Sequence, residues 1–278
     1  MSLFDAFRVS AHSIPCVPGG TAENLKKIEN WATRAAEKGV RLAVFPELCV
    51  QGYWMAPDAR RVAEAIDGPS VKELTRIAES LELIISAGIT ELRGRDLFNT
   101  QVFVGPKGLI GYQSKTHVTP LRESECYRSD TEYHLIRTEL CDLGCAICYD
   151  NHFSEASLIP EKMGATVLVM PFCCGRCTSD SLQTDSLNQM EYRTRCRDTG
   201  MFGVLANQCG RRDNDYYYGT WCGVIDPNGE YLARTEPGTE GEHMVLADIS
   251  PEPYIKRLQE RPSRHRRFED FKALVDYP

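Results

Sequence analysis

Short runs of apolar residues alternate along the chain with longer segments in which apolar residues recur every three or four positions. The short runs have the length of buried strands, and the longer segments have the period of an amphipathic helix. Strands are predicted at Phe7–Ile14, 42–45, 83–89, 143–148, 167–170 and 203–206. Helices are predicted at 21–38, from residue 70 to about residue 81, and at 180–199. Helices and strands are therefore expected to alternate through the whole chain.

Local signals mark the ends of two of these helices. Gly39 is expected to stop the helix over 21–38, because glycine readily adopts the left-handed conformation that ends helices. Ser70 and Glu73 have the spacing of a capping box, in which each side chain satisfies a backbone N–H left free at the helix start. The second helix is therefore predicted to begin at this pair.

Two hairpins predict that part of the sheet is antiparallel. The segments 97–104 and 109–113 are joined by Gly-Pro-Lys-Gly, and a second hairpin turns at Asp-Pro-Asn-Gly over 226–229. Buried strands such as 167–170 need cover on both faces, which places helix layers outside sheet layers. The pattern predicts an α/β sandwich with mixed sheets.

Composition and charge narrow the class of protein. The chain has 278 residues, 42% hydrophobic and 26% charged, with no linker-like segment, so we expect one domain over 1–278 with a C-terminal extension over about 250–278. The formal net charge of -7 argues against binding to nucleic acid or to anionic membranes. No secretory signal and no apolar run of roughly 20 residues is visible, so a cytoplasmic protein is expected. The 12 cysteines are then interpreted as reduced thiols.

Three polar residues end or follow predicted strands. Glu47 follows the strand at 42–45, Lys115 follows the second strand of the first hairpin, and Cys148 closes the strand at 143–148. Strand ends and their loops are where rigid elements of α/β proteins present reactive groups. Each residue alone is more often structural, and only their local contexts together indicate catalysis.

Those contexts are Phe-Pro-Glu-Leu at 45–48, Lys-Thr-His at 115–117 and Cys-Tyr-Asp at 148–150. In this order the three motifs resemble the nitrilase superfamily of carbon–nitrogen hydrolases, and weaker agreement extends over about residues 7–249. The resemblance implies a four-layer α-β-β-α sandwich. It also implies hydrolysis, by water, of a non-peptide C–N bond in a small amide or N-carbamoyl compound, with no cofactor or metal. Relatives commonly form dimers or larger assemblies, so a homodimer is expected, with 180–199 and the C-terminal stretch as candidate interface segments.

The resemblance also assigns roles to residues. Cys148 is the nucleophile, Glu47 the general base, and Lys115 the cation beside the developing oxyanion, which the Tyr149 backbone N–H also stabilises. Glu123 matches a further glutamate of the family, which orients the lysine or the substrate; a surface salt bridge is the alternative.

Two large side chains are candidate pocket walls by the same resemblance. Tyr53 follows the first motif, and Phe172 follows the strand at 167–170. Large apolar residues are more often part of a core, which is the alternative for both.

Several alternatives stay open. Tyr149-Asp150 favours amide and carbamoyl hydrolysis over nitrile hydrolysis, because nitrile-hydrolysing relatives usually have Trp-Glu at these positions.

Two Cys-x-x-Cys pairs, at 145–148 and 174–177, would suit a zinc site or a thiol-binding scaffold without catalysis. Against zinc, residues three apart on a strand face opposite ways; against thiol exchange, no helix start is predicted directly after Cys148. The thiols Cys173, Cys174 and Cys177 either line the pocket or pack.

Overall fold

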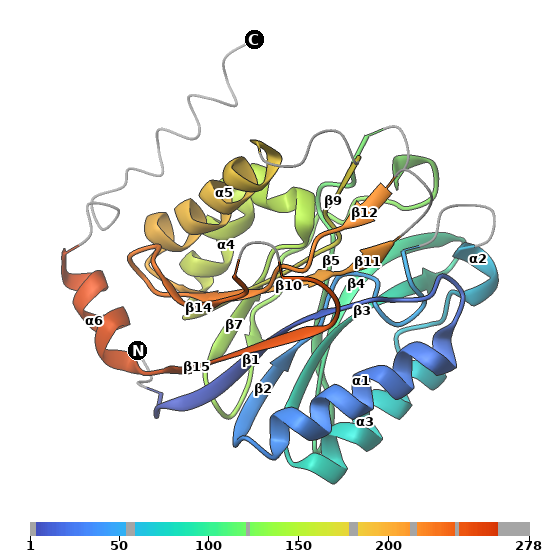
Figure 1. The fold of residues 1–278 in the computed structure, drawn as a ribbon, viewed down its shortest axis with the longest axis horizontal. Helices are drawn as coiled ribbons and strands as arrows, with labels where there is room; N and C mark the ends of the chain where they lie inside the picture. The colour runs from blue at the N-terminus through green and yellow to red at the C-terminus, as the bar shows by residue number, and fades with distance from the viewer. Residues whose placement is uncertain are drawn as a thin grey trace.

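The computed structural model describes residues 4–53, 59–120, 123–177, 183–211, 216–236 and 239–260. One long mixed sheet is folded so that its two halves face each other (Figure 1). The halves meet where Ser13 and Ile14 at the end of β1 pair in parallel with Asn207 and Gln208 at the end of β10. The first half has the order β5-β4-β3-β2-β1, and the second continues β10-β8-β7-β6.

The strands of the first half are β1 (Phe7–Ile14), β2 (Val40–Val44), β3 (Ile84–Arg93), β4 (Asp96–Gly105) and β5 (Gly108–Ser114). Those of the second half are β10 (Phe202–Gln208), β8 (Val167–Phe172), β7 (Asp142–Cys145) and β6 (Ile136–Arg137). Three strands lie off this path: β15 (His243–Ile249) pairs with β1, β13 (Gly223–Ile225) with β10, and β14 (Tyr231–Arg234) with β13. A separate small sheet has the order β11-β12-β9, formed by Gly210–Arg211, Tyr216–Tyr218 and Gly175–Cys177.

Helices cover the outer faces of both halves. In Figure 1, α1 (Thr21–Ala36) and α3 (Pro69–Leu81) lie on the first half, and α4 (Glu155–Met163) and α5 (Gln183–Thr199) lie on the second. The shorter elements are α2 (Ala59–Val62), η1 (Glu123–Glu125), η2 (Cys148–His152) and α6 (Pro251–Glu260). The molecule thus has four layers in space: helices, the first half of the sheet, the second half of the sheet, and helices. This is the expected four-layer sandwich with mixed strand directions, so the predicted fold class is confirmed.

Alternation of side chains along the strands divides the core. Leu42 and Val44 of β2 face the second half of the sheet and share a buried cluster with Val169, whereas Ala43 faces the cluster under α1 and α3. A third cluster lies between the second half and α4 and α5, with Leu168 at its centre. Because successive strand residues point to opposite faces, each central strand supplies two cores, which is why these strands are apolar throughout.

The predicted elements agree closely with the structure in most places. The first strand has the predicted bounds, α1 ends at Ala36 with Gly39 in the left-handed region at φ +76°, and both hairpins form. The predicted helix over 180–199 is α5 from Gln183, and residues 180–182 lie outside the described part, as do 261–278 of the C-terminal extension.

Two local predictions are wrong. The capping box does not form: Pro69 is the first residue of α3, and the Glu64 carboxylate accepts hydrogen bonds from the Ser70 backbone N–H and hydroxyl, each at 2.7 Å. Glu73 instead pairs with Arg76. The predicted strand 143–148 ends at Cys145, and the next turn is helical, so a helix does start at Cys148, against expectation.

Candidate active site

Strand direction brings the three predicted catalytic residues to one edge of the folded sheet. β2 and β3 are parallel, and β5 runs the same way because it is antiparallel to β4, which is antiparallel to β3. β7 has this direction too, through the parallel series β1, β10, β8 and β7. The carboxyl ends of β2, β5 and β7 therefore point to the same side, where Glu47, Lys115 and Cys148 follow them.

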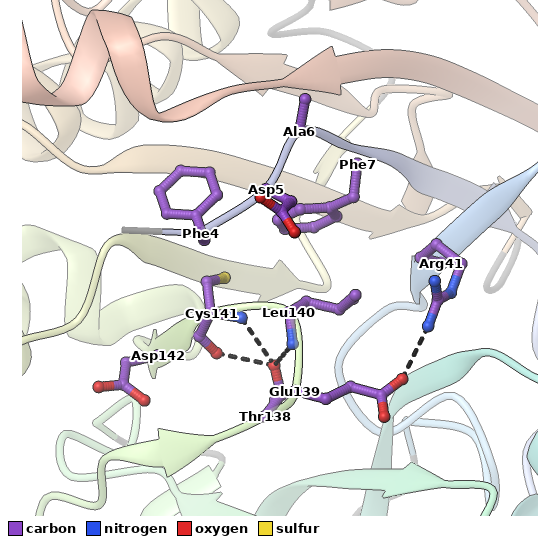
Figure 2. A pocket seen from close by; sticks show the side chains of 10 residues that line it. All are labelled: Phe4, Asp5, Ala6, Phe7, Arg41, Thr138, Glu139, Leu140, Cys141 and Asp142. Carbon is purple, nitrogen blue, oxygen red and sulfur yellow. Dashed lines mark hydrogen bonds and ion pairs between the residues drawn. The ribbon is translucent and has the colours of Figure 1, made fainter. Parts of the chain in front are cut away.

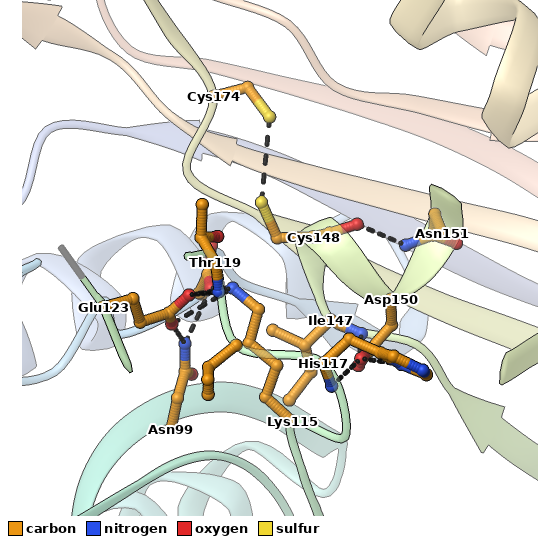
Figure 3. A network of polar contacts seen from close by, with 12 residues as sticks. Asn99, Lys115, His117, Thr119, Glu123, Ile147, Cys148, Asp150, Asn151 and Cys174 are labelled. Atoms are coloured by element: carbon orange, nitrogen blue, oxygen red, sulfur yellow. Dashed lines mark hydrogen bonds and ion pairs between the residues drawn. The ribbon is translucent and has the colours of Figure 1, made fainter. Parts of the chain in front are cut away.

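Lys115 is fully buried between two carboxylates (Figure 3). Its Nζ donates to Glu47 Oε1 at 2.7 Å and to Glu123 Oε2 at 2.8 Å, and the three side chains have no exposed surface. Asn99 of β4 donates from one Nδ2 to both carboxylates, at 2.7 Å to Glu47 and 2.8 Å to Glu123. The Thr119 backbone N–H donates to Glu123 at 2.8 Å. Glu123 is thus a buried partner of Lys115, and the surface salt bridge considered as its alternative is wrong.

The two carboxyls differ in protonation chemistry because their contacts differ. Burial and the charge of Glu123 raise the pKa of Glu47, although Lys115 opposes the shift. Burial would raise the pKa of Glu123 as well, but Lys115 and the hydrogen bonds from Thr119 and Asn99 outweigh it and lower that pKa. Burial disfavours the Lys115 ammonium, yet the two carboxylates outweigh it and raise the pKa of Lys115 well above its usual value. The pKa of Glu47 and the pKa of Glu123 are therefore shifted in opposite directions by their surroundings.

One oxygen of Glu47 is available for that exchange. Within the described residues, Oε2 of Glu47 is buried and has no hydrogen-bond partner, while Oε1 is held by Lys115 and Asn99. An unpaired carboxylate oxygen in an enclosed site is costly and is a natural proton acceptor.

The backbone is strained at the thiol residue itself and at the residue that directly follows the acid. Cys148 has φ +49°, and Leu48, which directly follows Glu47, has φ +48°. Residues other than glycine rarely adopt this conformation, and it concentrates at functional sites where the surroundings enforce it. At Cys148 the strained residue begins η2, whose first backbone N–H groups, including that of Tyr149, lack intrahelical partners.

Asp150 helps to hold the strained backbone at Cys148 in place. Its Oδ2 accepts from the Ile147 N–H at 2.9 Å, and its Oδ1 accepts from the His117 N–H at 2.7 Å and the Thr116 hydroxyl at 2.9 Å (Figure 3). This single buried carboxylate therefore links the turn that carries Cys148 to the loop that carries Lys115. The sequence motif contains Asp150, but its bridging role depends on the tertiary structure.

The Cys148 thiol is half-buried and lies against a second thiol. Its Sγ is 3.8 Å from Sγ of Cys174, which follows β8. This contact and burial raise the pKa of Cys148 well above its usual value, and Glu47 adds to the shift while Lys115 opposes it. The resting thiol is consequently protonated and needs a base to become a nucleophile.

The structure describes both predicted pocket residues. Tyr53 packs against the buried cluster that contains Leu48, and burial together with the charge of Glu123 raises the pKa of its hydroxyl well above its usual value. Phe172 has no exposed surface and packs edge-on against Trp221 and at a tilt against Tyr192, with ring centroids 4.8 and 5.1 Å apart. The cluster of Phe172 and Tyr192 also contacts Cys148 and Cys174. Phe172 is thus a core residue directly behind the thiols.

Sequence reasoning missed Asn99, Cys174 as the neighbour of the nucleophile, and Tyr192. Asn99 is a single polar residue within a strand, and no local sequence pattern distinguishes it from a polar strand residue that faces solvent. The sequence places Cys174 in a Cys-x-x-Cys pair and in a group of three thiols, and neither pattern indicates Cys148 as its particular neighbour.

The two Cys-x-x-Cys pairs meet only through Cys148 and Cys174 among the residues with described side chains. Cys145 is buried between the sheet halves. Within the described part of the chain, no group of three His, Cys, Asp or Glu side chains is arranged to hold a metal ion. The side chain of Cys177 lies outside the described part.

A separate surface hollow lies at the opposite end of β2 (Figure 2). It is lined by residues 4–7, Arg41 and residues 138–142, and Arg41 pairs there with Glu139 at 2.7 Å. Arg41 is near the start of β2 whereas Glu47 follows its end, so this hollow is not part of the candidate active site.

Comparison with known proteins identifies the class of the chain. Residues 8–255 match the family model of the carbon-nitrogen hydrolases, so the chain belongs to this family. The omega-amidase NIT2 of Danio rerio is 28% identical over 265 residues, covering 91% of this chain and 92% of the relative. The deaminated glutathione amidase of Bos taurus is 28% identical over 273 residues, covering 92% and 80%.

A solved structure agrees at the level of the fold. Saccharomyces cerevisiae Nit3, a member of branch 10 of the nitrilase superfamily, has a TM-score of 0.83 and 22% identity over 94% of this chain and 96% of that chain. The expected membership in the nitrilase superfamily, on its amidase-like side, is confirmed. The chain is a hydrolase that acts on carbon–nitrogen bonds other than peptide bonds. Throughout the described residues, every helix is too short or too polar to cross a membrane.

Proposed function

We propose that the protein hydrolyses the C–N bond of a small amide or N-carbamoyl compound through a covalent intermediate on Cys148. The observation that carries the proposal is the buried Lys115 between Glu47 and Glu123, with one oxygen of Glu47 unpaired and the Cys148 thiol within electrostatic range of both Lys115 and Glu47. These are the nucleophile, base and cation that acyl transfer requires.

In the first half-reaction, Glu47 takes the thiol proton and Cys148 Sγ attacks the carbonyl carbon. Negative charge develops on the carbonyl oxygen, where the Lys115 ammonium and the Tyr149 backbone N–H stabilise it. Lys115 Nζ donates to one oxygen of Glu47 at 2.7 Å and to the two oxygens of Glu123 at 2.8 and 3.1 Å. An ammonium has three N–H donors, so when the two oxygens of Glu123 share one donor, the third is available to this oxygen. The protonated Glu47 then returns its proton to the leaving nitrogen as the C–N bond breaks, and ammonia or an amine departs from a thioester.

In the second half-reaction, water replaces the leaving group. Glu47 takes a proton from water, the hydroxyl adds to the thioester carbon, and the Cys148–carbon bond breaks. The acid product leaves and the thiol regains its proton. Glu123, whose lowered pKa keeps it charged throughout, maintains Lys115 as a cation and orients it.

The test is a matched substrate series with ammonia release as the readout. The names of the relatives suggest ω-amides and deaminated glutathione as the first members, with N-carbamoyl and nitrile analogues of equal length beside them. We expect turnover of amides or carbamoyl compounds and little of nitriles. Cys148→Ala should reduce turnover about 10⁴-fold or more, because the whole covalent route depends on this sulfur.

Cys141→Ser is the matched control, since Cys141 is a buried thiol beside the hollow at the opposite end of β2, outside the site. An active Cys148→Ala variant would contradict the mechanism. Turnover of nitriles alone would contradict the substrate class and leave the nucleophile in place.

A further inference from the structure

The mechanism leaves one conspicuous nucleophile unused, the thiol of Cys174. Figure 3 shows Cys174 and Cys148 with their sulfur atoms directed at each other from two different elements, the loop after β8 and the start of η2. The two Sγ atoms are 3.8 Å apart, which is van der Waals contact, and both residues are partly exposed. An oxidant that enters the active site would therefore meet both sulfur atoms.

The position of Cys174 is fixed by its backbone. Its N–H donates to Asn207 Oδ1 at 3.0 Å, and its carbonyl accepts from Asn207 Nδ2 at 3.2 Å. The same Nδ2 also donates to the Gly219 carbonyl at 2.9 Å. Asn207 lies in β10, so the central sheet holds Cys174 opposite the nucleophile. A disulfide needs sulfurs about 2.05 Å apart, so the two Sγ atoms, which are 3.8 Å apart, must move closer together for the bond to form.

The other thiols nearby are turned elsewhere. Cys173 is directed towards Tyr218, and Cys145 is buried between the halves of the sheet. Among the described thiols, Cys174 alone is in hydrogen-bonding contact with Cys148.

We propose that Cys148 and Cys174 form a peroxide-modification site, in which the nucleophile is stored reversibly as a disulfide. Glu47 takes the Cys148 proton and the thiolate attacks one oxygen of a hydroperoxide; the S–O bond forms, the O–O bond breaks, and the other oxygen leaves with the proton from Glu47 as water or an alcohol. The Cys174 sulfur then attacks the sulfenic acid sulfur, the S–S bond forms, and the hydroxyl leaves with the Cys174 proton as water. Two thiols lose two electrons in total, and the peroxide gains them.

This pairing has a chemical consequence for the enzyme. A nucleophilic cysteine without a thiol neighbour is oxidised onward to sulfinic acid, which ordinary reductants do not reverse. A disulfide stops this progression, and a dithiol reductant restores both thiols. Hydroperoxide is then expected to switch the hydrolase off without destroying it.

The experiment treats the whole protein with hydrogen peroxide and follows mass, peptide linkage and activity. The wild type should lose about 2 Da, yield a Cys148–Cys174 cross-linked peptide under non-reducing conditions, and regain most of its activity with dithiothreitol. Cys174→Ser should instead gain about 32 Da at Cys148 and regain less than about a tenth of the lost activity. Each variant is compared with its own untreated activity.

Cys173→Ser is the neighbouring control and should behave as the wild type does. A Cys173–Cys174 or other linkage in the peptide map would overturn the proposal, as would equal recovery in wild type and Cys174→Ser. The loss of activity rests on the proposed role of Cys148. The mass and linkage measurements do not depend on that role. A cross-link in a protein without amidase turnover would therefore refute only the proposed function.

Discussion

Lys115 is the residue around which the site is organised. A buried ammonium is tolerated only when it is paired, and here two carboxylates more than offset the cost of its burial. Of the two carboxylates, Glu47 has the less stabilised negative charge, because Glu123 accepts an additional hydrogen bond from the Thr119 backbone N–H. The resulting difference between two chemically identical side chains is the basis of their proposed roles, Glu47 as the base and Glu123 as a fixed counter-ion.

The division of labour between the carboxylates predicts a shift in pH dependence. Glu47 must be unprotonated to act as base, so kcat/KM falls as the pH drops through its raised pKa. Glu123→Gln removes the charge that contributes to this raised pKa, so the acidic limb of the profile should move to lower pH. The maximal rate should also fall, by about 10-fold or more, because Lys115 loses an orienting partner.

Initial rates over a pH series measure both effects. Glu29→Gln, which alters an ion pair on the outer face of α1, should leave the limb in place. A limb that stays fixed in Glu123→Gln would refute the electrostatic coupling of the two carboxyls.

His12 makes a residue-level prediction about stability. Its ring is fully buried, stacks on Phe45 at 4.2 Å and contacts the Val44 carbonyl through Nδ1 at 3.0 Å. Burial lowers the pKa of His12 to about 4. The unfolded chain, with an ordinary pKa near 6.5, therefore binds a proton before the folded one does, and stability falls as the pH drops from about 6.5 to about 4.

Between pH 7 and pH 5 this single group should remove about 2 kcal/mol of unfolding free energy. Urea unfolding of wild type and His12→Gln at both pH values isolates the contribution, since the other titrating groups are shared. We expect the pH-dependent loss to be smaller in the variant by about that amount. Equal losses in the two proteins would show that His12 is not held neutral.

At the scale of elements, the turn after β2 is shaped by an unusually close approach of β3. A Cβ atom added at Gly88 would lie 2.1 Å from the Leu48 backbone nitrogen and 2.8 Å from the Glu47 carbonyl carbon. Hydrogen bonds from Gly88 N–H to the Pro46 carbonyl and from Val50 N–H to the Gly88 carbonyl fasten the two segments. The glycine is therefore needed for space, and the turn that presents Glu47 depends on it.

Gly88→Ala should accordingly destabilise the fold by about 1–3 kcal/mol and lower turnover, because the backbone of the Glu47 turn must move. Denaturant unfolding and ammonia release measure the two effects. Gly219→Ala is the matched control for stability, since a Cβ there meets no atom within 4 Å. A fully stable and active Gly88→Ala protein would show that the turn is free to relax.

The elements also show where local sequence is a sufficient guide. The bounds of β1 and the end of α1 at Gly39 follow from apolar period and glycine conformation, which are properties of neighbouring residues. The capping box at Ser70 does not form because the carboxylate of Glu64, a residue outside the helix, accepts the hydrogen bond from the Ser70 backbone N–H. The strand expected to reach Cys148 ended early because Asp150 draws the Ile147 N–H into a turn.

At the scale of the whole molecule, exposed apolar side chains gather on the outer helices of the second half. Ile159 and Met163 of α4 and Met190 of α5 are among the most exposed large apolar residues described. Solvent-exposed side chains of this size on adjacent helices favour a protein interface. We therefore propose that α4 and α5 form a dimer interface, as the segment 180–199 suggested.

Light scattering should give about twice the chain mass of 31.3 kDa, and Met190→Lys should shift the mass towards that of one chain. Leu109→Lys, on β5 in the other half of the sheet, should leave the mass unchanged. A monomeric wild type at micromolar concentration would refute the interface.

Apolar period in the sequence was enough to predict an α/β sandwich, and the resemblance of three short motifs to a known family pointed to the acid, the amine and the sulfur, because both signals are written in neighbouring residues. The folded molecule was needed to show which carboxyl has the raised pKa, why Gly88 must be small, and that Cys174 faces Cys148. Each of these depends on burial and on contacts between strands distant in the chain. Electrostatic free energies and packing distances are set by such contacts, and no local pattern encodes them.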